Sequence, residues 1–219
     1  MRLAAIDIGS NAARLLITDV IPGLQGEPEF IKVVLVRVPL RLGFDVFDKG
    51  EISPGKSDKI IKTIKAYKLL LDVYEVKHLK ACATSAMRDA VNAPEIIKKV
   101  QTETGIGIEV ITGDQEASLI YENHIAENLS VEESYLYIDV GGGSTELTFF
   151  SDGKMVFKKS FNIGTIRLLK NQVTEAAWDE MKEFIRNKTK GYHHVTAIGS
   201  GGNINKIFSI SKRKEGKAL

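Results

Sequence analysis

The chain has 219 residues, 43% of them hydrophobic, which is enough to bury a core in one large domain or in two modest lobes. Its 30 basic and 28 acidic side chains leave a formal charge of +2, so the overall charge gives no argument for a nucleic acid polymer as partner. A single cysteine, Cys82, cannot form an intramolecular disulfide, and no apolar run has the length of a membrane span or a signal peptide core, so we expect a soluble cytoplasmic protein with no membrane partner.

The first part of the chain predicts three strands followed by alternating strands and helices. Apolar runs, helical spacing and turn residues predict, in chain order, strands over 3–8, 13–20 and 30–38, a helix over 56–75, a strand over 79–83, a helix over 93–103, a strand over 108–111 and a helix over 114–127. Three antiparallel strands followed by such alternation indicate an α/β sandwich with a mixed sheet.

The opening pattern then returns. A strand over 135–140 runs into a glycine turn, and strands over 145–150 and 155–161 follow before a helix over 174–189, a strand over 194–198 and a final helix start. This repeat of topology predicts two lobes of one fold that face each other across a cleft. We expect lobe I over 1–128 and lobe II over 129–219, with lobe II incomplete at its C-terminal end.

The turn between Asp139 and Glu146 carries the most specific signal. Gly141, Gly142 and Gly143 cost conformational entropy without adding packing, so they suit a backbone that closely approaches a ligand, followed by Ser144 and Thr145. Two carboxylates beside an anion-binding turn imply a divalent cation, because bare carboxylates repel phosphate. A glycine-rich turn with surface acids is the alternative, and the functional interpretation is favoured because a similar turn opens the chain.

That first turn starts at Asp7 and continues through Gly9, Ser10 and Asn11. Its backbone N–H groups can cradle phosphate, and Asp7 can hold a hydrated Mg²⁺. Taken alone, the pattern is more typical of an ordinary hairpin.

Three other positions are weaker candidates. Glu116 follows a strand and suits a general base on water, although its local sequence is also simply helix-favouring. Arg88 suits a bidentate phosphate contact or a surface ion pair, and the sequence leaves both open. Gly201 lies between a strand and a helix start, where backbone amides suit another phosphate.

Taken in order, these motifs resemble the exopolyphosphatase / guanosine pentaphosphate phosphohydrolase (Ppx/GppA) family, within the superfamily of actin, sugar kinases and 70-kDa heat-shock chaperones. The resemblance rests on DIGSN at 7–11, RLG at 41–43, ATSAMRDAVNA at 83–93, ITGDQEASLIY at 111–121, IDVGGGSTEL at 138–147 and GSGGN at 199–203. It implies two ribonuclease H-like lobes and Mg²⁺-dependent removal of terminal phosphate from linear polyphosphate or guanosine pentaphosphate (pppGpp), with a homodimer as one possible assembly.

By position, the resemblance implies that Glu116 activates water and that Asp139 and Glu146, with Asp7, lie around the metal and phosphate. It also assigns phosphate binding to the two turns, to Arg88 and to Gly201. The chain departs from the family pattern at Ala12, Phe44 and Gln115, and it stops before the helices that close the second lobe. An ATP-dependent kinase or ATPase of the same superfamily, and a non-catalytic sensor of polyphosphate or guanosine polyphosphates, remain the alternatives.

Overall fold

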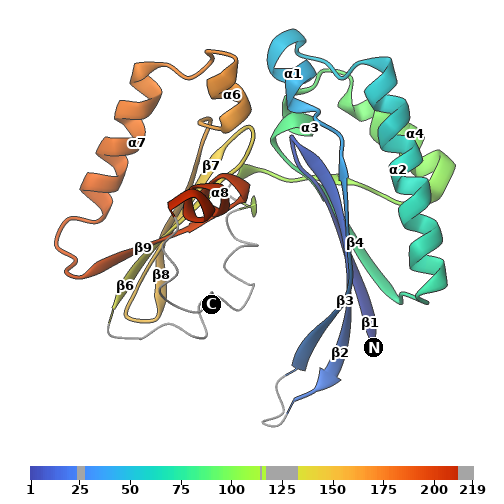
Figure 1. The fold of residues 1–219 in the computed structure, drawn as a ribbon, viewed down its shortest axis with the longest axis horizontal. Coiled ribbons are helices and arrows are strands. Elements are labelled where there is room, and N and C mark those ends of the chain that lie inside the picture. The colour runs from blue at the N-terminus through green and yellow to red at the C-terminus, as the bar shows by residue number, and fades with distance from the viewer. Residues whose placement is uncertain (24–27, 114, 117–132, 212–219) are drawn as a thin grey trace. The chain divides into compact units, whose positions relative to one another are not determined.

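The structure is a computed structural model, and it describes residues 1–23, 28–113, 115–116 and 133–211. The chain divides into two compact units, Met1–Thr112 and Gly113–Leu219. Each unit holds one mixed sheet with helices, which confirms the predicted α/β class (Figure 1).

The first unit is built on a five-stranded sheet with the order β3-β2-β1-β4-β5. Strands β1 to β3 are antiparallel, and β1, β4 and β5 run parallel. Its elements are β1 (Arg2–Ile8), β2 (Ala12–Pro22), β3 (Pro28–Pro39), α1 (Gly43–Lys49), α2 (Pro54–Val73), β4 (His78–Ala83), α3 (Ser85–Asp89), α4 (Ala93–Thr104) and β5 (Glu109–Val110).

Helix α2 supplies one wall of the first unit's core. Ile60, Ile64 and Tyr67 are almost fully buried, at a spacing of three to four residues that puts them on one helix face. The strands contribute apolar residues such as Ile6 and Leu15, also buried. This packing fixes the sheet whose strand ends carry the candidate residues of the first unit.

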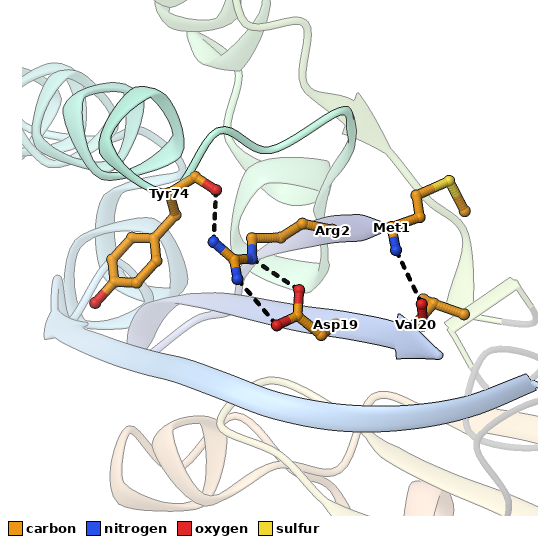
Figure 2. A network of polar contacts seen from close by, with 5 residues as sticks. All are labelled: Met1, Arg2, Asp19, Val20 and Tyr74. Atoms are coloured by element: carbon orange, nitrogen blue, oxygen red, sulfur yellow. Dashed lines mark hydrogen bonds and ion pairs between the residues drawn. The ribbon is translucent and has the colours of Figure 1, made fainter. Parts of the chain in front are cut away.

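A polar network anchors the end of β1 where the chain begins (Figure 2). Arg2 donates from Nε and Nη2 to the two carboxylate oxygens of Asp19 on β2, at 2.8 and 2.9 Å. Its Nη1 donates to the carbonyl of Tyr74, which ends α2, at 2.9 Å. The hydrogen bond and the charge of Arg2 lower the pKa of Asp19. One guanidinium therefore joins two strands and a helix.

The second unit repeats this plan with a four-stranded sheet in the order β8-β7-β6-β9. Its elements are β6 (Ser134–Val140), β7 (Thr145–Ser151), β8 (Lys154–Phe161), α6 (Thr165–Leu169), α7 (Glu175–Lys188), β9 (Val195–Ser200) and α8 (Gly202–Ser211). Two antiparallel pairs precede one parallel pair, whereas the first unit adds a second parallel pair through β5. A core of Leu136, Leu147, Phe149, Phe161 and Ile163 packs against apolar residues of α7, including Trp178 and Phe184.

The differences from the sequence prediction fall on short elements. Helices α1, α3 and α6 were not predicted, because five to seven residues show too little periodicity to be recognised. The strand predicted over 108–111 contains only Glu109–Val110, and the last strand extends to Ser200. Most of the helix predicted over 114–127 lies outside the described residues. Among the described helices, none is long and apolar enough to cross a bilayer.

Candidate active site

The two hairpin turns share one backbone design. In the first, the N–H of Gly9 donates to the carbonyl of Ala12 at 3.0 Å; in the second, the N–H of Gly141 donates to that of Ser144 at 2.9 Å. Each turn starts two residues after an aspartate, Asp7 or Asp139, at the end of its central strand. The repeat of topology therefore extends to the hydrogen bond that closes each turn.

The glycine turn of the second unit is held from one side by the start of α6. The carbonyls of Gly141 and Gly142 accept from the N–H groups of Thr165 and Ile166, at 3.1 and 2.8 Å. The carbonyl of Gly143 accepts from Nε of Arg167 at 2.7 Å. In a trans peptide the carbonyl and the following N–H point in opposite directions. The N–H groups that follow these carbonyls therefore point away from α6.

Those N–H groups are available to a ligand. Within the described residues, no hydrogen bond uses the backbone N–H of Gly142 or Gly143 as its donor. Successive free amides in a turn form a concave anion-binding site, which suits phosphate oxygens.

Contact between the start of α6 and this turn is close enough to require glycine at position 164. A Cβ at Gly164 would lie 2.5 Å from the carbonyl oxygen of Gly142 and 2.5 Å from the carbonyl carbon of Gly143. Beside it, the hydroxyl of Thr145 donates to the carbonyl of Ile163 at 2.5 Å and is buried. The side chain of Thr145 therefore supports the turn from within the fold.

The two carboxylates predicted beside the turn face each other across the β6–β7 ladder. Asp139 and Glu146 are direct cross-strand partners, so their side chains lie on the same face of the sheet. Glu146 is only 3% exposed, and its Oε1 accepts from the hydroxyl of Ser160 on β8 at 2.9 Å. The strand register places Ser160 opposite Glu146 and Ser200 opposite Asp139, so these four residues form one cross-strand row.

Gly201 closes this row next to Asp139. Its φ of +98° lies in the left-handed region, and a Cβ there would lie 3.1 Å from Oδ1 of Asp139 and 2.9 Å from the carbonyl of Val140. Glycine is needed at 201 for both reasons. The backbone after β9 thus lies against the first carboxylate of the pair.

The helical segment that carries Glu116 begins beside β8, the strand next to Glu146. Gly113 is so close to Ser160 that a Cβ on it would lie 2.5 Å from the Cβ of Ser160. Residues 113, 115 and 116 are helical, so Glu116 follows Gly113 by about one turn, a rise of roughly 5 Å. Glu116 is half-buried there. Asp139 and Glu146 therefore lie together in the second unit, and Gly113, which opens the helical segment of Glu116, lies against the strand next to them.

This donor set suits Mg²⁺, which proteins usually bind through one or two carboxylates with water and substrate phosphate completing the shell. Asp139 and Glu146 supply two carboxylates beside a turn whose amides suit phosphate. Among the described residues no cluster of three or more His, Cys, Asp or Glu side chains forms a closed metal site. The chemistry of the pair fits a cation shared with substrate.

In the first unit, Asp7 forms an ion pair with Arg14, its cross-strand partner, at 2.8 Å. The hydroxyl of Ser10 is buried and shares a 2.7 Å hydrogen bond with that of Ser85. The carbonyl of Asn11 accepts from Leu40 and Arg41, and that of Ser10 from Gly43. This turn, like the second, is held through its carbonyls by the segment that follows the third strand.

Arg88 lies on α3, one turn beyond Ser85, and is half-buried. Its Nη1 donates to the carbonyl of Ile111 at 2.8 Å. A guanidinium has five N–H donors, so this bond orients Arg88 and leaves donors for a further acceptor. Arg88, Asp7, Gly9, Ser10 and Asn11 all belong to the first unit.

Sequence reasoning did not find several residues that shape the site. Arg14 holds the position in the first turn that Glu146 holds in the second, and the repeat could have revealed it. Ser160, Gly164 and Arg167 depend on strand register and on α6, for which the sequence carries no local signal.

Comparison with known proteins identifies relatives. The chain is 34% identical over 201 residues to a bifunctional 3-dehydroquinate synthase/phosphatase of Fusobacterium nucleatum, covering 89% of this chain and 28% of that protein. It is 34% identical over 172 residues to exopolyphosphatase 2 of Mycobacterium tuberculosis, covering 76% of this chain and 53% of that protein. The chain thus spans about half or less of the length of these relatives.

A solved structure and a family sequence model also match this chain. The crystal structure of the Ppx/GppA family member of Aquifex aeolicus matches with a TM-score of 0.74 at 30% identity, covering 100% of this chain and 72% of that one. A sequence model of the Ppx/GppA phosphatase family matches residues 26–215, which contain the glycine turn, both carboxylates and Glu116. The chain belongs to the Ppx/GppA phosphatase family.

Proposed function

We propose that this chain carries the hydrolytic site of a phosphatase that removes the terminal phosphate of linear polyphosphate, with pppGpp as the second substrate candidate. The observation that carries the proposal is the pairing of Asp139 with Glu146 beside a turn whose carbonyls are held from one side. Exopolyphosphatase 2 of M. tuberculosis is among its relatives, which supports the same substrate class.

The reaction is attack of water on the terminal phosphorus, in line with the anhydride oxygen that leaves. Glu116 accepts the proton of the attacking water, the new P–O bond forms, and the anhydride bond breaks to release orthophosphate and a shortened chain. The amides of Gly142 and Gly143 hold oxygens of the transferred phosphoryl group. Asp139 and Glu146 would hold Mg²⁺, whose positive charge would offset the negative charge of the phosphate oxygens.

The first unit contributes to binding in this proposal. The turn at Gly9, Ser10 and Asn11 offers amides to phosphate, and Arg88 offers the guanidinium donors that Ile111 leaves free. Asp7 remains a proposed ligand of hydrated Mg²⁺. Its ion pair with Arg14 is exposed, so rearrangement on binding costs little.

The experiment measures phosphate release from polyphosphate, pppGpp and ATP in parallel, with and without Mg²⁺. Glu116→Gln keeps the size of the side chain and removes its basicity, so release should fall roughly 100- to 10,000-fold. The matched control is Glu180→Gln, the same change at a 65%-exposed position of the second unit, which should leave release unchanged.

Each outcome decides between functions. Release from polyphosphate or pppGpp that requires both Mg²⁺ and Glu116 supports the hydrolase and selects its substrate. Preferential turnover of ATP would instead support a kinase or ATPase. Tight binding of these polyanions without release would indicate a sensor.

A further inference from the structure

Ser160 on β8 lies against Glu146 and against Gly113, and none of the motifs in the sequence points to it. Its hydroxyl donates to Oε1 of the buried Glu146 at 2.9 Å. Its Cβ occupies the space that a side chain at Gly113 would need, 2.5 Å from the ideal Cβ position. Gly113 opens the helical segment that carries Glu116.

We infer that Ser160 is a positioning residue that sets the spacing between Glu116 and Glu146. The hydroxyl orients Glu146, and the Cβ sets how closely the segment that starts at Gly113 approaches β8. This inference rests on the proposed function for its effect on turnover. Its steric part stands independently of any activity.

The steric part follows from the backbone. The φ of Gly113 lies outside the left-handed region, so its conformation is open to alanine. Alanine is also the better helix former. What excludes a side chain at 113 is therefore the Cβ of Ser160, which cannot rotate away because it is fixed to the strand backbone.

The effect of Gly113→Ala on stability should depend on whether Ser160 carries a Cβ. In the wild type, Gly113→Ala should push the segment off β8, lower the melting temperature by several degrees and reduce kcat about 100-fold. In a Ser160→Gly background the same Gly113→Ala change should be neutral or stabilising, because the obstruction is gone and helix propensity alone remains.

The hydroxyl is tested separately. Ser160→Ala keeps the Cβ and removes the donor to Glu146, so kcat should fall at least tenfold with little change in KM, since it disturbs positioning rather than substrate binding. The matched control is Ser151→Ala, which removes another buried serine hydroxyl of the same sheet, bonded to Ser134 at 3.0 Å at the far end of β7.

The experiment is a double-mutant cycle on the full chain, read by melting temperature and by kcat and KM for polyphosphate. A Gly113→Ala penalty that disappears with Ser160→Gly, together with a kcat loss for Ser160→Ala that Ser151→Ala does not share, would support the inference. An equal Gly113→Ala penalty in both backgrounds, or a Ser160→Ala enzyme as active as wild type, would overturn it. If the wild type releases no phosphate from any substrate, the proposed function fails while the melting temperatures still test the spacing.

Discussion

The first and second hairpin turns have the same closing hydrogen bond and the same place in their sheets, yet they present opposite charges. Opposite Asp7 lies Arg14, and opposite Asp139 lies Glu146. The cross-strand row of the second unit contains two acids flanked by Ser160 and Ser200. In the first unit, Arg37 extends the row beyond Arg14.

One backbone design therefore carries two different arrangements of charge. A row of two facing carboxylates suits a cation, whereas a row in which arginines balance or exceed the nearby acids suits an anion. Under the proposed function, the second unit therefore organises the metal and the water. The first unit mainly contributes to holding the phosphate chain.

Different side-chain hydrogen bonds support the two turns. Tyr67 reaches from α2 and donates its hydroxyl to the carbonyl of Ala13, just after the first turn, at 3.0 Å. At the equivalent place in the second turn, the hydroxyl of Thr145 donates to Ile163. Tyr67 ties the first turn to a long helix, whereas the second turn depends on the short segment around α6.

The sharpest test of the charge difference is Glu146→Gln. The amide keeps the shape of the side chain and can still accept from Ser160, but it removes one of the two facing charges. We expect Mg²⁺-dependent phosphate release to fall about 100-fold or more, with a higher Mg²⁺ concentration needed for half of the remaining rate. Measuring release against Mg²⁺ concentration checks this; an unchanged Mg²⁺ requirement would contradict the metal-holding role of the pair.

Gly164→Ala tests the support of the second turn. Its Cβ would lie 2.5 Å from turn backbone atoms that cannot move aside easily, so we expect a loss of about 1–3 kcal/mol in the free energy of unfolding. Chemical denaturation measures it. Gly55→Ala is the control, because a Cβ at Gly55 has nothing within 4 Å. Equal stability of the two variants would mean that the start of α6 does not pack closely against the turn.

Tyr67→Phe tests the support of the first turn. Removing the hydroxyl should cost about 1 kcal/mol of unfolding free energy at neutral pH. Burial raises the pKa of Tyr67 to about 12, above its ordinary value of 10, so ionisation favours the unfolded chain. The neutral side chain contributes fully below pH 10, and this contribution is lost as the pH rises from 10 to 12.

Denaturation curves at several pH values between 9 and 12 would show this effect. The fall in stability over that range should be shallower in Tyr67→Phe than in the wild type, because the substituted side chain cannot ionise. If unfolding free energy falls equally with pH in the two proteins, the hydroxyl of Tyr67 is less buried than the structure indicates.

The smallest effect is expected for Arg14→Gln. Its ion pair with Asp7 is about half exposed on both sides, so stability should change by less than about 1 kcal/mol. If the first turn serves the substrate, KM for polyphosphate should rise more than kcat falls. Thermal melting and steady-state kinetics separate the two effects, and a large loss of stability would assign Arg14 to the fold instead.

Much of this arrangement could be predicted from the sequence, because long apolar runs, glycine turns and the repeated strand–turn–strand pattern are local signals. The antiparallel opening strands of both sheets and the flanking positions of Asp139 and Glu146 followed from them. Ser160 and Arg167 could not be found in this way. Their roles depend on register and on which backbone carbonyl a side chain meets, and these are set by packing between segments that are distant in the sequence.

The Arg2 network lies at the opposite end of β1 from the first turn, and it bears on how β1 and β2 align. A slip of one residue between two strands would turn every side chain of one strand to the other face. The bidentate ion pair of Arg2 with Asp19 is made in the register that places these two residues opposite each other, and the bond to Tyr74 ties the same strand pair to the end of α2. The ion pair at the start of β1 therefore favours the same register that places Asp7 opposite Arg14 at the other end of the strand.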